Sequence, residues 1–345
     1  MPTTGCRRKP IRGDDPMRAW ICYDLRTLDN GKSSARLAHE AIEQLAWADD
    51  KPFEAVVLPE HHGCPDGYLP SPLVLGAAIA ARTKRIRLIH AAALLPLLNP
   101  IRVAEDAATL DLISNGRLAL GVGLGYVPTE FEMFGIAMKD RVGRLEDGIT
   151  VLRKAFTGEQ FLYEGRTARV APRPVQEAGP PIYVCGAVKA AARRAARLGD
   201  GFIPTSADVI EQYFTECNRL GKPAGPVDPL LSPLCVHVAE DPERTWAAIA
   251  PHAVHETAEY GRWAAAARDH SRMDSPFADG IDADAVRALG VHTVVTPEEC
   301  VELVRHAESN NAPINFKPLT GPPEIGWQTL ELFANKVVPM LTSSE

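Results

Sequence analysis

The chain has 345 residues, of which 46% are hydrophobic and 23% are charged, which is enough for one large globular domain or two ordinary ones. Lys and Arg number 37 against 44 Asp and Glu, a formal net charge of −7. Without a basic surface to neutralise phosphates, the composition argues against a nucleic-acid partner.

The apolar stretches are much shorter than the ~20 residues that span a bilayer, and no apolar signal segment follows the N-terminal arm. We therefore expect a cytoplasmic protein that does not enter a membrane. The seven cysteines are odd in number and scattered, with no CxxC pair. This pattern indicates buried free thiols and neither a disulfide framework nor a zinc site.

Residues 1–16 contain almost no apolar side chains, which predicts a disordered arm before one domain over residues 17–345. From Met17 onward, short apolar runs alternate with amphipathic stretches of helical length. Eight runs are predicted to be buried strands: Ala19–Tyr23, Ala55–Leu58, Ile86–Ala91, Leu118–Gly121, Ile182–Cys185, Gly201–Pro204, Leu234–Val238 and Pro313–Lys317.

Several helices between these strands have clear first turns. Ser33 or Ser34 can cap the first helix, Pro72 can stand in the first turn of the second, and residues 296–299 (Thr-Pro-Glu-Glu) can open a late one. Strands that are each followed by a helix favour a parallel sheet covered by helices.

Eight strand–helix units predict an α/β fold of the (β/α)8 TIM barrel class. A doubly wound parallel sheet is the alternative, since strands are easily miscounted from one sequence. Residues 240–289 are too long for one crossover helix. We expect a helical insertion there, between strands seven and eight, with a polar link at residues 269–279.

In a barrel, function lies at the C-terminal ends of the strands. The second strand runs into Glu60, His61 and His62, and histidine exchanges protons near neutral pH. The alternative is a loop in which the histidines only form local hydrogen bonds. No third ligand stands at a metal-binding spacing, so no metal site is predicted.

Two other strand ends are rich in glycine. Residues 121–126 (Gly-Val-Gly-Leu-Gly-Tyr) resemble a dinucleotide loop, but the acids about 20 residues on, Glu146 and Asp147, fall in a helix, which argues against that motif. Residues 185–189 lead from the fifth strand into a helix, where free N–H groups and Lys189 can bind an anion. An ordinary turn is the alternative there.

Taken together, these segments closely resemble the bacterial luciferase-like flavin-dependent oxidoreductases from about Met17 to Leu341. The matching blocks are His90–Arg117, Glu60–His62, Gly121–Tyr126, Glu130–Phe131, Phe134–Gly135, Arg141–Glu146, Arg193–Ile203, Thr296–Glu299 and Leu330–Leu341. The resemblance implies a (β/α)8 barrel, often dimeric, that holds FMN or a deazaflavin at its C-terminal mouth. It also implies a non-prolyl cis peptide at Ala91-Ala92, in a bulge against which the flavin ring rests.

The resemblance makes His61 the active-site histidine and His62 its neighbour. It implies that the flavin phosphate binds near the turn at residues 186–189, with Arg141 as a further cation. The implied flavin contacts are Ala91, Ala92, Gly123, Tyr126, Arg141, Gly186, Ala187, Val188 and Lys189.

Two positions depart from the family pattern. Leu124 replaces an arginine that many relatives use for phosphate, and Ala187-Val188 replaces small hydroxyl residues at a helix start. Since a charge-assisted hydrogen bond contributes roughly 1.5–3 kcal/mol, losing one or two would weaken FMN binding tenfold or a hundredfold. Weak binding suits an enzyme that receives reduced flavin from a separate reductase. It also suits a barrel that has lost its flavin.

The insertion carries His255, Glu256, Tyr260 and Trp263. The resemblance places this region over the substrate side of the flavin, but core packing of the two aromatic rings is the alternative that we favour.

The first functional hypothesis is a monooxygenase that uses reduced FMN and dioxygen to oxidise a small organic substrate, as a homodimer. The second is an oxidoreductase that uses the deazaflavin coenzyme F420, although many relatives of that kind have Asp-His at the strand end that carries Glu60 here. The third is a barrel that binds flavin without catalysis.

Overall fold

The computed structural model describes residues 18–29, 33–267, 277 and 279–343. The predicted arm at residues 1–16 and the link at 269–279, apart from Phe277 and Asp279, lie outside the described residues. Nine strands of the described chain form one sheet, in the order β10-β9-β11-β1-β2-β3-β4-β7-β8. Every neighbouring pair in it is parallel.

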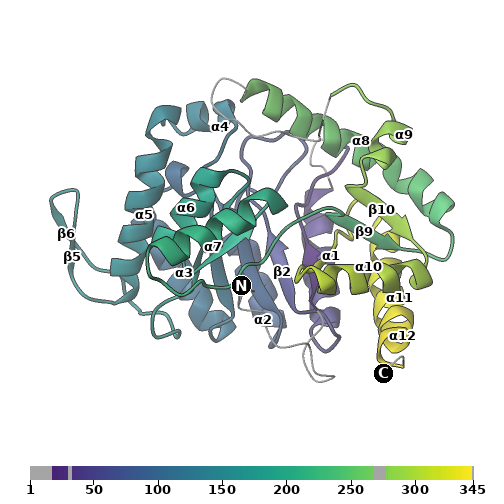
Figure 1. The fold of residues 1–345 in the computed structure, drawn as a ribbon, viewed down its shortest axis with the longest axis horizontal. Helices are drawn as coiled ribbons and strands as arrows, with labels where there is room; N and C mark the ends of the chain where they lie inside the picture. Colours follow the sequence, from purple (N-terminus) through teal and green to yellow (C-terminus); the bar gives the residue numbers. More distant parts are fainter. Residues whose placement is uncertain (1–17, 30–32, 268–276, 278, 344–345) are drawn as a thin grey trace.

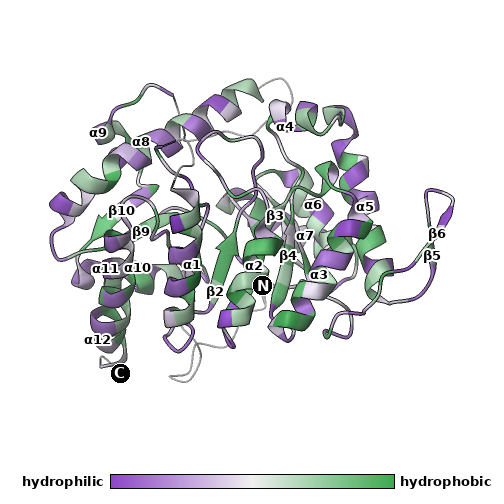
Figure 2. Ribbon diagram, turned by 180° about the vertical axis from the view of Figure 1, so that it is seen from behind, coloured by the Kyte–Doolittle hydropathy of each residue, from purple (hydrophilic) through white to green (hydrophobic). Residues whose placement is uncertain are grey.

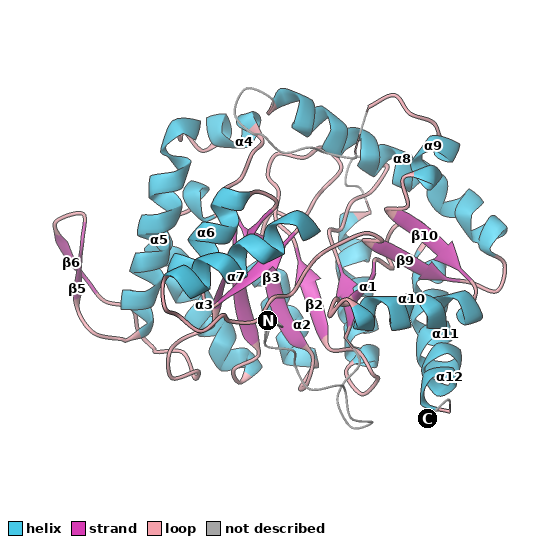
Figure 3. Ribbon diagram, viewed as in Figure 1, coloured by secondary structure: helices cyan, strands magenta, loops and turns pink. Residues whose placement is uncertain are grey.

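All eight predicted strands are present in this sheet. Their bounds are β1 (Ala19–Cys22), β2 (Ala55–Leu58), β3 (Arg87–Ala93), β4 (Leu118–Val122), β7 (Ile182–Gly186), β8 (Gly201–Pro204), β9 (Cys235–Val238) and β11 (Ile314–Phe316). Helices cover the sheet (Figures 1 and 3). Figure 2 shows hydrophobic strands at the centre and helices of mixed colour around them, as expected for amphipathic helices on a buried sheet.

The longer helices follow the strands in turn. They are α1 (Ser34–Ala48), α2 (Pro72–Arg82), α3 (Pro100–Ser114), α5 (Arg141–Phe156), α6 (Lys189–Leu198), α7 (Ile210–Arg219), α8 (Pro242–Ala266), α10 (Pro297–Ser309) and α11 (Pro323–Leu332). Shorter ones are α4 (Pro128–Met133), α9 (Ala283–Ala288) and α12 (Val338–Thr342), with single turns η1 (Leu95–Leu97), η2 (Met138–Asp140) and η3 (Ala207–Val209) and the π-helical η4 (Phe333–Val337). Within the described part of the chain, no helix has the length and apolar character needed to cross a membrane.

The sheet curves around an interior of its own. Alternate residues of six strands leave the helix-covered core and form a second buried cluster: Trp20, Ala55, Val57, Ile89, Ala91, Ala119, Tyr183 and Ile203. Arg18 lies just before the N-terminal end of β1 and donates to Asp228 at 2.6 Å. Asp228 belongs to a segment that runs beside β8. This pair joins parts that are far apart in the strand order, as a barrel requires.

The predicted (β/α)8 barrel fold is therefore confirmed. Its hydrogen-bonded ladder runs from β10 to β8, and the strand pairs found among the described residues do not include one between β8 and β9.

The sequence did not predict three strands. The strand β10 (His292–Val295) pairs with β9, and its His-Thr start hides the apolar pattern. The strands β5 (Phe161–Tyr163) and β6 (Arg166–Ala168) form an exposed antiparallel hairpin. Its two turn residues, Glu164 and Gly165, have φ of 48° and 74°, the twist that a two-residue hairpin favours.

The predicted helix ends are largely as expected. Thr296 and Glu299 form a reciprocal capping box at α10, and Pro72 is the first residue of α2. Ser33 precedes α1, but its side chain makes no capping hydrogen bond. The insertion contains α8 and α9, and Figure 1 shows α8 across the top of the molecule, above the strands.

Candidate functional site

His61 and Glu130 form a buried pair at the end of β2. The Nδ1 atom of His61 lies 2.8 Å from Oε1 of Glu130 on α4, and the same oxygen accepts from the backbone N–H of His62 at 2.8 Å. A carboxylate only accepts hydrogen bonds, so Nδ1 of His61 carries the proton and donates. This leaves Nε2 of His61 as the basic nitrogen.

Glu60 is the centre of a second buried group. Its two carboxylate oxygens accept from Nε2 of His62 (2.9 Å) and from Nε2 of His90 on β3 (2.7 Å). Burial raises the pKa of Glu60, but the hydrogen bonds and charges of His62 and His90 outweigh it and lower the pKa to about 2. Glu60 therefore stays ionised and fixes both imidazoles.

Aromatic rings enclose His61. Trp263 and Tyr260 of α8 lie with their ring centroids 4.4 and 6.1 Å from the imidazole, and those of Tyr68 and Tyr126 are 4.8 and 6.0 Å away. Tyr260 and Trp263 are half-buried. Tyr260 and Trp263 are therefore packed, as the favoured expectation had it. They also form a wall beside His61.

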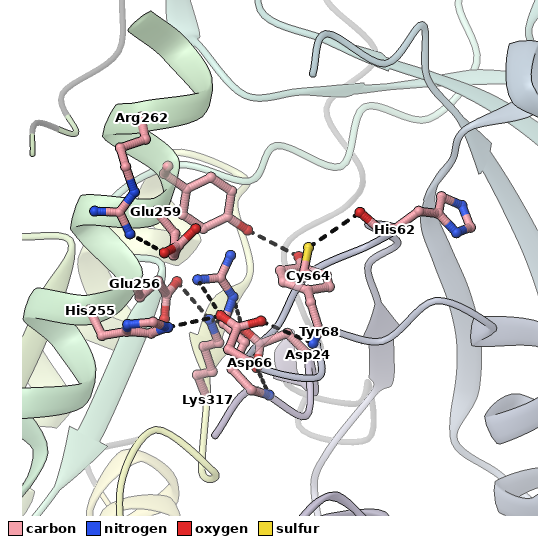
Figure 4. A network of polar contacts seen from close by, with 12 residues as sticks. Asp24, His62, Cys64, Asp66, Tyr68, His255, Glu256, Glu259, Arg262 and Lys317 are labelled. Carbon is pink, nitrogen blue, oxygen red and sulfur yellow. Dashed lines mark hydrogen bonds and ion pairs between the residues drawn. The ribbon is translucent and has the colours of Figure 1, made fainter. Parts of the chain in front are cut away.

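A network of buried charges adjoins this wall (Figure 4). Nζ of Lys317 lies 2.6 Å from both Asp24 and Glu256. Burial lowers the pKa of Lys317, but these two carboxylates outweigh it and raise the pKa well above its usual value. The guanidinium of Arg26 lies over the rings of Tyr68, Tyr260 and Trp263, 4.6 to 5.0 Å from their centroids.

The bulge predicted to support the flavin ring is present. The Ala91-Ala92 peptide is cis, and the pairing of β3 with β4 shifts register between Ala91 and Ala93. Gly123 lies directly against Ala92, because a Cβ on Gly123 would stand 2.9 Å from the Ala92 methyl group. The two alanines and Gly123 thus come together at the C-terminal ends of β3 and β4, which we call the rim. His90, which bonds Glu60, directly precedes Ala91 on β3.

The turn predicted to bind phosphate lies at the end of β7, beside β4. Val188 is the N-cap residue of α6 and offers no side-chain hydrogen bond to the helix, so its first N–H groups remain available to an anion. Lys189 is exposed. Arg141 is the first residue of α5, where it donates to the carbonyl of Met138 at 2.8 Å.

The residues that depart from the family pattern serve the core instead. Leu124 and Val188 are partly buried and pack against the main hydrophobic cluster. Neither side chain can donate to a phosphate. The backbone N–H groups of residues 186–189 are therefore the main hydrogen-bond donors that this part of the chain offers to a phosphate.

The described cavities do not lie over His61. One, of about 10 Å³ beside Asp24 and Arg26, holds at most one water molecule. The other, of about 300 Å³, is outside the barrel, between α5, α6 and α7. The side chains of Trp263 and Tyr260 occupy the approach to His61.

The sequence did not assign roles to Glu130 or His90. Glu130 appeared only within a matched block, and His90 only as a strand residue that begins another matched block. Their roles depend on a loop and a neighbouring strand being brought to β2 by the fold. The sequence around Glu130 carries no signal that this acid, and not the neighbouring Glu132, is the buried one.

The lowered pKa of Glu60 predicts a pH-dependent stability. The unfolded carboxyl has a pKa of 4.5 and the folded one about 2, so the unfolded chain takes up the proton first as the pH falls. The stabilisation is therefore complete above about pH 5 and is lost toward pH 2. In urea unfolding, the free energy of unfolding of wild type should exceed that of Glu60→Gln by most at neutral pH. This difference between the two proteins should become smaller in acid. The exposed control Glu159→Gln should change the free energy of unfolding little at any pH, and a Glu60→Gln difference that does not vary with pH contradicts the assignment.

Comparison with known proteins places this geometry in a family. Residues 22–312 match the family model described as luciferase-like monooxygenase. An F420-dependent glucose-6-phosphate dehydrogenase of Segniliparus rotundus is 27% identical over 328 residues, which cover 88% of this chain and 94% of that protein.

Two further similar proteins are monooxygenases by description. The oxygenase component of a flavin-dependent trigonelline monooxygenase of Acinetobacter baylyi is 30% identical over 49% of this chain and 48% of that protein. The chain spans about half the length of several curated relatives that it matches. The crystal structure of a monooxygenase from Streptomyces bottropensis has 26% identity and a TM-score of 0.75, over 93% of this chain and 99% of that one. With a family model that matches most of its length, the chain belongs to the luciferase-like monooxygenase family.

Proposed function

We propose that this protein is a monooxygenase that uses reduced FMN, supplied by a separate reductase, and dioxygen to oxidise a small organic substrate. The observation that carries the proposal is the His61–Glu130 pair beside the Ala91-Ala92 bulge, in an aromatic enclosure. The relative in A. baylyi, which is the oxygenase component of such a system, supports the separate reductase.

The proposed reaction balances as follows. One oxygen atom of dioxygen enters the substrate and the other leaves as water. When bound, reduced FMN supplies two electrons and two protons for this reduction.

The protein's part is to hold and move a proton at His61. Since Nδ1 donates to Glu130, Nε2 is the atom that accepts a proton from a reacting group and returns it. The carboxylate stabilises the imidazolium that forms, as an orienting acid does for a histidine base. Glu130 thus acts as a positioning residue.

The residues present fit a flavin at two places. The open start of α6 suits its phosphate, and the small side chains at Ala91, Ala92 and Gly123 allow a flat ring to lie close to the backbone. Tyr126, near His61, would border the ring. The rings of Trp263 and Tyr260 lie over His61, so substrate would reach His61 as these two rings shift.

The use of coenzyme F420 is a second candidate, because the S. rotundus dehydrogenase matches nearly the whole chain. Flavin binding without catalysis is the third, and it is motivated by Leu124 and Ala187-Val188. Absorbance titrations with FMN, reduced FMN and F420 separate the two cofactors, and single-turnover oxidation of bound reduced FMN with product counted separates catalysis from binding alone. Tight binding of F420 alone would replace our proposal, and no binding of any of them would favour a structural role.

We also propose a homodimer. Val74 of α2 and Leu112 and Ile113 of α3 are 73%, 42% and 47% exposed on two helices that pack side by side. Exposed apolar side chains on two neighbouring helices are candidates for burial against a second subunit. Analytical ultracentrifugation of wild type should give a dimer, and Ile113→Glu should shift it toward monomer. A monomeric wild type at micromolar concentration excludes the dimer.

The turn at residues 186–189 predicts selectivity for the flavin phosphate. Riboflavin differs from FMN only by this group, and one charge-assisted contact contributes roughly 1.5–3 kcal/mol. FMN should therefore bind about tenfold more tightly or better, with reduced FMN tighter than oxidised. Lys189→Ala should reduce the difference in affinity between FMN and riboflavin. Lys154→Ala, which changes a residue in the last turn of α5, should leave that difference unchanged. Equal affinity of wild type for FMN and riboflavin contradicts this phosphate site.

The His61 role predicts loss of coupling. His61→Ala should lower coupled product per folded molecule about 10²–10⁴-fold and release hydrogen peroxide instead, and it should also lower stability, because the buried carboxylate of Glu130 loses a partner. His62→Ala should do less, because His62 contacts Glu60 and not Glu130 through its ring. The measurement is single-turnover oxidation of reduced FMN with product and peroxide both counted. If His61→Ala is less stable but couples as well as wild type per folded molecule, His61 only anchors its loop.

A further inference from the structure

Three side chains of different ligand types meet away from His61, under the insertion. Cys235 of β9, His292 of β10 and Glu256 of α8 each present one ligand atom, and these atoms all lie within 4.8 Å of one another. Cys235 and His292 are direct partners in the parallel strand pair. Val294, two residues beyond His292, packs against the hydrophobic cluster that contains Ile249 and Ala253 of α8, so this face of the strands is turned to the helix.

His292 is the second, independent observation. Its side chain is buried, and neither ring nitrogen has a hydrogen-bond partner among the described residues. Such an unpartnered polar group is costly. Nε2 of His292 stands 3.9 Å from Oε2 of Glu256, which is too long for a hydrogen bond. Two ligand atoms that are each ~2.0–2.1 Å from one tetrahedral ion lie roughly 3.3 Å apart. A small approach of Nε2 and Oε2 would therefore let both atoms bind the same ion.

Glu256 is divided between two partners. Its Oε1 accepts from Nζ of Lys317 at 2.6 Å, which leaves Oε2 toward His292. Figure 4 shows Glu256 reaching from α8 toward Lys317. The carboxylate is thus already oriented by a cation on one side, in the way that hydrogen-bonded neighbours orient metal ligands.

The charge around the cluster also suits a cation. Among the described neighbours, Asp24, Asp66 and Glu256 supply three negative charges, against two positive charges from Arg26 and Lys317. The three carboxylates thus exceed the two cations by one charge, which favours a cation beside them.

We propose that Cys235, Glu256 and His292 bind a divalent ion of the zinc type. Thiolate, imidazole and carboxylate are the ligands that zinc takes in proteins. The fourth position is open to water or to His237, whose Nε2 has no hydrogen-bond partner among the described residues and which follows Cys235 on the same face of β9. The sequence does not reveal the site, because its ligands come from three separate elements.

The site has a consequence for the rest of the molecule. Glu256, Tyr260 and Trp263 stand four and seven residues apart on α8 and so share one face of the helix. An ion that fixes Glu256 to β9 and β10 therefore fixes the helix that places Trp263 against His61. Its role is structural, and its test needs no flavin.

The experiment is a cobalt titration of the full-length protein after treatment with a chelator and its removal. Wild type should bind about one Co²⁺ per chain, with the near-ultraviolet band of a thiolate–cobalt bond, and Zn²⁺ should displace it and raise Tm. Cys235→Ser should abolish the band. His292→Ala should weaken binding by more than the roughly 10–100-fold that loss of an outer partner costs.

Cys300 is a buried cysteine on α10 outside the cluster, so Cys300→Ser is the matched control. This variant should keep both the thiolate–cobalt band and the rise in Tm. Glu256→Gln retains the size of the side chain and serves if the other variants do not fold, as judged by circular dichroism. A wild type that binds no Co²⁺ overturns the proposal. So does a thiolate band that survives Cys235→Ser, or unchanged affinity in folded Glu256→Gln.

Discussion

The structure of the rim depends on the cost of burying two carboxylates. Glu60 and Glu130 are 4% and 2% exposed, and an ionised acid removed from water needs partners on its oxygens. His62 and His90 satisfy Glu60, while His61 and the His62 backbone satisfy Glu130. Because these partners come from β2, β3 and α4, the two acids lock the ends of neighbouring units into one arrangement.

That arrangement determines what His61 can do. Glu130 accepts a hydrogen bond from Nδ1–H of His61, which leaves Nε2 as the acceptor nitrogen, and aromatic rings surround the imidazole. A proton-exchanging group in an aromatic enclosure suits oxidation chemistry in which a reactive oxygen must not meet solvent. The wall belongs to α8, so the insertion is part of the site, although it lies outside the regular strand–helix repeat.

The sequence was informative where a local pattern has a local cause. Buried parallel strands are continuous apolar runs, so all eight barrel strands were predicted near their observed bounds. Pro72 and the Thr296–Glu299 box act within one helical turn and were also predicted. The Ala91-Ala92 cis peptide came from resemblance to a family, since no local pattern in two alanines requires it.

The sequence was uninformative where partners are distant in the chain. His61 was predicted to be functional, but Glu130 becomes its partner only when α4 folds over the end of β2. Likewise, Trp263 was expected to pack or to line substrate, and the path of α8 is what packs it against His61. The strand β10 was missed because its neighbour β9 completes a hydrophobic face that the short His-Thr-Val-Val run lacks by itself.

The central claim is that one flavin site spans the bulge, His61 and the start of α6. A crystal structure of the protein with FMN tests this claim most directly. We predict the flavin ring against Ala91-Ala92 with its reactive edge facing Nε2 of His61, the phosphate on the backbone of residues 186–189, and Trp263 displaced from its present contact with His61. Flavin bound elsewhere, or a Trp263 that still covers His61 with the ring site filled by side chains, would contradict the account.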